Sequence, residues 1–131
     1  MTVNYRSVKG FLESSNRLSD LHNRVKEALY EKRVFRLVCG GKYLWVFSSR
    51  DRDYLIIPKI YCSCVDFELN VIVRGSKKYC YHLITQYIAE SKGMFKELTI
   101  SNELLNDIFI ELIYIGRSNA LRKLMMYGGN S

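Results

Sequence analysis

The chain has 131 residues, which is enough for a single domain, spanning 1–131, with a modest hydrophobic core. Hydrophobic residues make up 48% of the sequence and charged residues 25%, close to the average for folded globular proteins, so wholesale disorder is excluded. Twenty Lys and Arg against thirteen Asp and Glu give a net charge of +7, which favours polyanionic partners, nucleic acid first among them.

The first half of the chain is expected to form one helix and three strands. Residues 14–32 place apolar side chains on one helical face: Leu18, Leu21, Val25, Ala28 and Leu29. Residues 33–39 and 42–48 are rich in β-branched and aromatic residues, and the Gly-Gly between them predicts a hairpin. A third strand spans 53–61. Pro58 cannot donate to a β-ladder, so this strand should be an edge there or carry a bulge.

Residues 65–74 alternate imperfectly between apolar and polar positions and are a candidate for a fourth strand. Residues 78–92 change to a spacing of three and four between apolar positions, and Gly93 follows as a stop signal. That pattern predicts a helix that begins close to Cys80.

The C-terminal part, residues 99–127, is expected to form two helices separated at Gly116. Thr99 or Ser101 can cap the first of them. Together these elements predict an α+β fold, in which a small antiparallel sheet of three to four strands carries helices from both ends of the chain.

Four of the six Cys and His residues occur as two pairs, each with one residue between its members. Cys62 and Cys64 lie at the end of a predicted strand, and Cys80 and His82 follow at the predicted start of a helix. Three thiolates and one imidazole make a closed tetrahedral set for Zn²⁺. The spacing therefore predicts one structural zinc ion that ties the strand end to the helix start.

The remaining two residues of this kind have no partner at ligand spacing. Cys39 directly precedes the Gly-Gly turn and is expected to pack as a small hydrophobic side chain. His22 lies in the first predicted helix and is interpreted as a surface or edge histidine.

The pattern C-x-C, a variable gap and C-x-H, set on a strand end and a helix start, resembles the SWIM zinc finger. The resemblance covers approximately residues 41–91. It includes Asp66 and Phe67 after the first ligand pair and Leu83 after the histidine. The four ligands implied by the resemblance are the same four that the spacing indicates.

A short chain that consists of little besides this module is similar to the stand-alone SWIM subunit of Shu-type recombination complexes. That resemblance implies a partner of the RecA/RadA recombinase paralogue type and a role on single-stranded DNA in homologous recombination and DNA repair. The alternative is an autonomous nucleic-acid-binding zinc finger protein that acts as a regulator.

Neither interpretation requires catalysis. A zinc ion with four protein ligands has no open position for water, and the sequence has no phosphate-binding loop, nucleophile elbow or HExxH motif. We therefore expect a non-enzymatic protein. No apolar run approaches the roughly 20 residues of a membrane span, and no secretory signal is apparent, so we expect an intracellular protein, cytoplasmic (nucleoid-associated) or nuclear.

Two features point to contact surfaces, and each has a simpler alternative. Basic residues form three groups that either contact phosphates or a partner, or only make a solvated charged face: Arg50 and Arg52; Arg74, Lys77 and Lys78; Arg117, Arg122 and Lys123. The C-terminal helices also carry many apolar residues, which either cover each other and the sheet or leave a partner surface.

Overall fold

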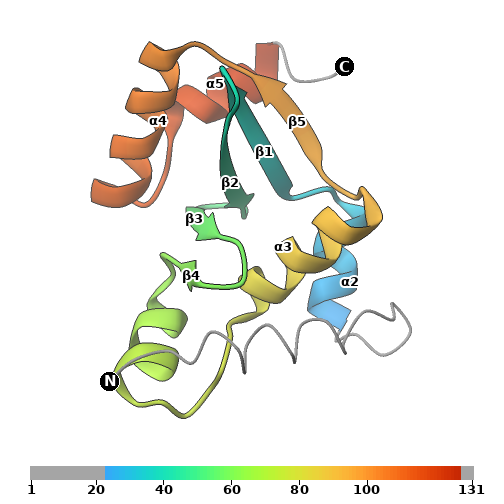
Figure 1. Cartoon of the computed structure of the whole chain (residues 1–131), viewed down its shortest axis with the longest axis vertical. Helices are drawn as coiled ribbons and strands as arrows, with labels where there is room; N and C mark the ends of the chain where they lie inside the picture. Colours follow the sequence, from blue (N-terminus) through green and yellow to red (C-terminus); the bar gives the residue numbers. More distant parts are fainter. Residues whose placement is uncertain (1–22, 128–131) are drawn as a thin grey trace.

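The computed structural model describes residues 23–127, in which a five-stranded sheet carries helices on both faces (Figure 1). The strand order is β4-β3-β2-β1-β5. The strands span Val34–Cys39 (β1), Lys42–Ser48 (β2), Asp53–Ile57 (β3), Tyr61–Cys62 (β4) and Lys96–Thr99 (β5). The predicted α+β class is confirmed.

The predicted hairpin of β1 and β2 is also confirmed. Cys39 pairs with Lys42, so the turn consists only of Gly40 and Gly41. Both glycines have positive φ, 52° and 83°, which is the conformation that a two-residue hairpin turn of this hand requires.

Alternation along the strands divides the core into two clusters, one on each face of the sheet. The first face packs on α2 (Asn23–Tyr30) and α3 (Tyr81–Lys92). Its strand residues include Val34, Trp45, Phe47 and Ile56. The second face packs on α4 (Asn102–Tyr114) and α5 (Asn119–Tyr127). Its strand residues include Phe35, Leu37, Val46 and Leu55.

The sheet differs from the prediction in having five strands and one parallel pairing. β5 was not expected, and it runs parallel to β1, with Phe35 opposite Lys96. The predicted third strand breaks after Ile57, where residues 58–60 turn and β4 returns antiparallel to β3. Pro58 therefore lies in a turn, where its missing N–H is not needed by the ladder.

The candidate fourth strand at residues 65–74 is wrong, because this segment forms the π-helix η2 (Phe67–Val73). Phe67 and Val71 are buried four residues apart, as on a helical face. Asn70 donates to Asp66 Oδ1 at 2.6 Å and holds the first turn together. The imperfect alternation reflects a helical period and not the two-residue period of a strand.

The helices begin and end close to the predicted residues. α3 ends at Lys92 and is followed by Gly93, whose φ of 68° is the left-handed conformation typical of a helix C-terminus. The first C-terminal helix is capped by Ser101 and not by Thr99, which closes β5. Residues 14–22 of the predicted N-terminal helix, with His22, lie outside the described residues. Within 23–127, no helix is long and apolar enough to cross a bilayer.

The cap at Ser101 provides a local test of this assignment. Its side chain accepts a hydrogen bond from the Leu104 amide at 3.2 Å. We expect Ser101→Ala to lower the free energy of unfolding by about 1 kcal/mol, a fall of about 3–5 °C in Tm. Ser91→Ala is the matched control, since the Ser91 hydroxyl only donates to Tyr87 O on the helix surface and its loss should be close to neutral. Equal melting curves for the two variants would contradict the assignment.

Candidate metal centre

The four predicted ligands converge on one buried point between β4 and α3. Cys62 ends β4, Cys64 follows in the next turn, Cys80 is the N-cap of α3 and His82 lies in its first turn. Their ligand atoms all lie within 4.8 Å of one another, and all four residues are buried. Cys62 Sγ lies 3.9 Å from His82 Nδ1.

This donor set fits one structural zinc ion. Zn–S bonds of about 2.3 Å and Zn–N bonds of about 2.0 Å place the donors of a tetrahedral site about 3.5–3.8 Å apart. The observed separations are compatible with that arrangement after small side-chain adjustments. Three thiols and an imidazole also match the preference of Zn²⁺ for sulfur and nitrogen donors.

The three thiols lie close enough together to shift one another's pKa. Hydrogen bonds from Cys62 and Cys80 to the Cys64 sulfur lower the pKa of Cys64. Hydrogen bonding of the Cys62 thiol to the same two sulfurs, together with burial, raises the pKa of Cys62. The pKa of Cys80 rises to about 12, because its contact with Cys64 and its burial outweigh the lowering effect of Cys62. A divalent cation at the centre of the cluster would stabilise all three thiolates.

The surroundings of the ligands hold them in position. The Phe67 amide donates to Cys64 Sγ at 3.3 Å, an interaction that stabilises a thiolate. Three aromatic rings surround His82, with centroid distances of 4.1 Å to Tyr81, 4.4 Å to Tyr54 and 4.6 Å to Phe47. Their packing restricts the orientation of the imidazole and leaves His82 only 7% exposed.

Sequence reasoning did not identify Phe47 and Tyr54 as parts of this site. They form a cross-strand pair between β2 and β3, so their side chains lie on the same face of the sheet as the ligands. Predicting that Phe47 and Tyr54 lie side by side requires the register of β2 and β3. That register depends on the length of the turn between the two strands.

The basic residues predicted to make contacts fall into two kinds: exposed residues, and one arginine that pairs with a buried carboxylate. Arg50 and Arg52 lie on the exposed turn between β2 and β3, and Lys77 lies on the loop before α3, where it pairs with Asp66 at 3.1 Å. Arg74 donates to Asn70 Oδ1. Lys78, Arg117 and Lys123 are exposed. The Arg52 and Arg117 guanidinium groups donate to backbone carbonyls, of Ile115 and Asp51 respectively.

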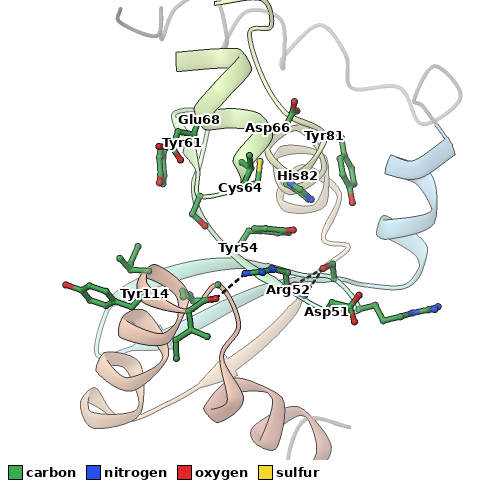
Figure 2. A pocket seen from close by; sticks show the side chains of 18 of the residues that line it. Asp51, Arg52, Tyr54, Tyr61, Cys64, Asp66, Glu68, Tyr81, His82 and Tyr114 are labelled. Atoms are coloured by element: carbon green, nitrogen blue, oxygen red, sulfur yellow. Dashed lines mark hydrogen bonds between the residues drawn. The ribbon is translucent and has the colours of Figure 1, made fainter. Parts of the chain in front are cut away.

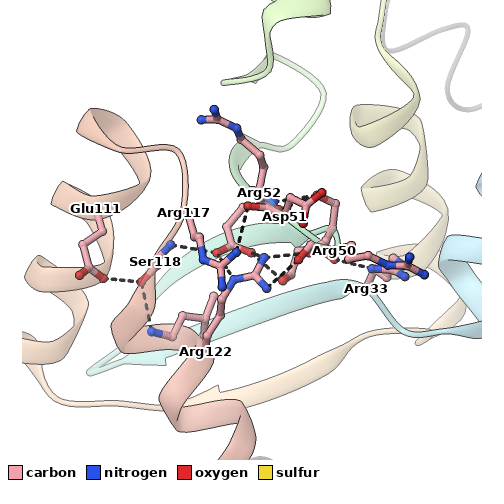
Figure 3. A network of polar contacts seen from close by, with 12 residues as sticks. Arg33, Arg50, Asp51, Arg52, Glu111, Arg117, Ser118 and Arg122 are labelled. Carbon is pink, nitrogen blue, oxygen red and sulfur yellow. Dashed lines mark hydrogen bonds and ion pairs between the residues drawn. The ribbon is translucent and has the colours of Figure 1, made fainter.

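Arg122 belongs to the second kind, because its guanidinium also pairs with a buried carboxylate. It forms an ion pair with the fully buried Asp53 and donates to the carbonyls of Ser49 and Arg50 (Figure 3). Asp53 also accepts from the Ser48 hydroxyl and from the Ser118 amide. This network ties α5 to the start of β3, which is a structural role that the charge pattern alone did not reveal.

A groove of about 1180 Å³ lies beside the metal centre (Figure 2). Tyr54 and Tyr61 line it near the ligands, and Cys64 and His82 reach its surface. The end of α4, with Ile113 and Tyr114, lines the opposite side. Charged residues of both signs also line it: Arg24, Arg50, Asp51, Arg52, Asp66, Glu68 and Lys77.

Comparison with known proteins agrees with the geometry of the ligands. The chain is 26% identical over 72 residues to the human zinc finger SWIM domain-containing protein 7, and 26% identical over 73 residues to the mouse protein of that name. These segments are 54% and 55% of this chain and only about half of each relative, 51% and 48%. No family model and no solved structure matches the chain. The similarity and the Cys/His cluster together support a SWIM-type zinc finger.

Proposed function

We propose that the protein is a non-enzymatic, zinc-binding accessory protein of homologous recombination and DNA repair. In this proposal it acts inside the cell with a recombinase paralogue of the RecA/RadA type on single-stranded DNA. The observation that carries the proposal is the buried C-x-C and C-x-H cluster, on a strand end and a helix start, in a chain similar to a SWIM domain-containing protein.

The chemistry of the site supports an accessory role better than catalysis. All four positions of a tetrahedral ion would be filled by protein ligands, which leaves none for a water or a substrate. The aromatic shell of His82 further restricts access to the imidazole. Such an ion would stabilise the surface that surrounds it, which is how a binding module uses zinc.

The proposed partner can be tested by co-expression with the RecA/RadA-type paralogue encoded in the same genome. We expect a complex of defined stoichiometry that contains zinc and survives size-exclusion chromatography with light scattering. A paralogue that elutes separately from the folded, zinc-loaded chain would contradict the proposed partnership.

The salt dependence of DNA binding distinguishes direct binding by the isolated chain from binding by the complex. We expect the isolated chain to bind an oligo-dT strand feebly, and the complex to bind it more tightly at the same ionic strength. Fluorescence anisotropy between low and high salt measures both, with a slope of about −0.7 per phosphate contact for single strands. Tight binding by the isolated chain, with a steep slope, would favour the autonomous nucleic-acid-binding alternative that the net charge of +7 suggests.

A further inference from the structure

The second half of helix α4 is apolar around almost its whole circumference. Ile108 and Leu112 are buried and pack on the sheet. On the opposite side lie four large side chains that remain exposed: Phe109 (46%), Ile110 (53%), Ile113 (45%) and Tyr114 (83%). We call these four residues the α4 outer face.

The outer face is not needed to hold α4 on the sheet. Ile108 and Leu112 already belong to the closed cluster formed with β1, β3 and α5. A helix that is apolar all round is normally covered on all sides, and contiguous exposed apolar patches commonly mark interaction sites. In Figure 1, α4 (orange) lies at the margin of the molecule, where a second protein can reach it.

The charge of α4 indicates what kind of partner fits. Its only charged residues are Glu103, Asp107 and Glu111, in a chain whose net charge is +7. Glu111 is engaged within the chain, where its carboxylate accepts from the Ser118 hydroxyl and the Ala120 amide. Glu103 and Asp107 are exposed and precede Ile110 and Tyr114 along one row of the helix, at spacings of three and four residues.

The outer face continues into the groove beside the metal centre. Ile113 and Tyr114 belong to both surfaces, and Val65, next to the ligand Cys64, lines the same groove and is itself exposed (Figure 2). A partner that covers the outer face therefore also contacts one side of the groove that lies beside the metal centre.

We propose that the α4 outer face docks an amphipathic helix of a partner protein, whose apolar stripe is accompanied by Lys or Arg side chains at the end that meets Glu103 and Asp107. A second copy of this chain fits less well, because α4 of that copy has no basic residue that could pair with Glu103 and Asp107. The inference deepens the proposed function, on which it rests for the idea that the protein works through a protein partner.

The proposal can be tested without the natural partner. The probe is a synthetic amphipathic peptide of about 18 residues with a leucine stripe and lysine at the polar positions, compared with the same peptide carrying glutamate in place of lysine. A protein of net charge +7 would attract the glutamate peptide by non-specific electrostatics. We expect the opposite order in titrations with the full zinc-loaded chain, with the lysine peptide at least about tenfold tighter.

Variants locate the binding surface. The double variant Ile110→Gln with Ile113→Gln should weaken binding of the lysine peptide about tenfold or more. Val73→Gln, a matched change at an exposed apolar residue of η2, should keep the affinity within about twofold of that of the unaltered protein. Glu103→Gln with Asp107→Asn should reduce the preference for lysine over glutamate and the sensitivity to salt. Melting curves and zinc content show that each variant is folded, and the charge pair tests the surface independently if the isoleucine pair does not fold.

The outcomes separate this inference from the proposed function. Equal binding of the two peptides, or binding that the isoleucine and charge variants leave unchanged, would overturn the docking face. A chain that is dimeric alone and becomes monomeric in the isoleucine variant would assign the face to a second copy instead. Binding of the lysine peptide without any complex with the RecA/RadA-type paralogue would leave the docking face in place and contradict the proposed partnership.

Discussion

We expect Cys64→Ala to abolish stoichiometric zinc binding and to unfold most of the protein at ordinary temperature. Zinc binding to small sites of this kind contributes about 10–16 kcal/mol, whereas a whole domain is usually stable by about 5–15 kcal/mol. Cys64 belongs to the same buried cluster as α2, α3 and the inner side chains of β2 and β3, so loss of the ion affects that entire face of the sheet. Elemental analysis and far-UV circular dichroism measure the two effects, and a strong chelator should reproduce them in the unaltered protein.

Cys39→Ala is the matched control. Cys39 is also a buried cysteine, but it belongs to the cluster on the other face of the sheet, where its thiol donates to Asn102 Oδ1 at 3.0 Å. This variant should keep one zinc per chain and lose only about 1 kcal/mol of stability. Full zinc content with an unchanged melting curve in Cys64→Ala would show that the ligand assignment is wrong.

The second large effect is expected at Asp53. Replacing it with Asn keeps the shape of the side chain but leaves the Arg122 guanidinium without its charge partner, and we expect a loss of about 3–5 kcal/mol. The structural reason is the complete burial of Asp53, whose carboxylate accepts hydrogen bonds from Arg122, Ser48 and Ser118. Urea denaturation followed by fluorescence of Trp45 measures the loss.

Three further variants make this test specific. Arg122→Met should be destabilising by a similar amount, and the combination of Asp53→Asn with Arg122→Met should be less damaging than the sum of the two. Lys77→Met removes the exposed ion pair with Asp66 and should change stability by less than about 1 kcal/mol. A loss at Asp53 no larger than that at Lys77 would contradict the structural role of the network.

The metal centre was largely predictable from the sequence because the features that define it lie close together along the chain. Each ligand pair lies within one short segment, and the change from strand-like to helical pattern after Cys80 indicated how the two pairs face each other. The same holds for the β1–β2 hairpin, where two adjacent glycines determine the turn.

Features that depend on distant segments were not predictable in this way. The sequence of β5, Lys-Glu-Leu-Thr, has little strand character, and the strand forms by pairing with β1, supported by an ion pair between Arg36 and Glu97. Arg122 was predicted as a contact residue, because nothing near it in the sequence shows that Asp53, 69 positions earlier, lies beside it. The helical period of 67–73 was obscured because only two of its residues, Phe67 and Val71, are buried.

The outermost strands of the sheet have a consequence for how the protein associates. β4 is only two residues long, and β5 presents Lys96 and Glu97 to solvent. Short borders and charged side chains discourage another chain from extending the sheet by strand addition. Growth into β-linked polymers is therefore disfavoured at both borders, which favours assembly through side-chain contacts over main-chain hydrogen bonding.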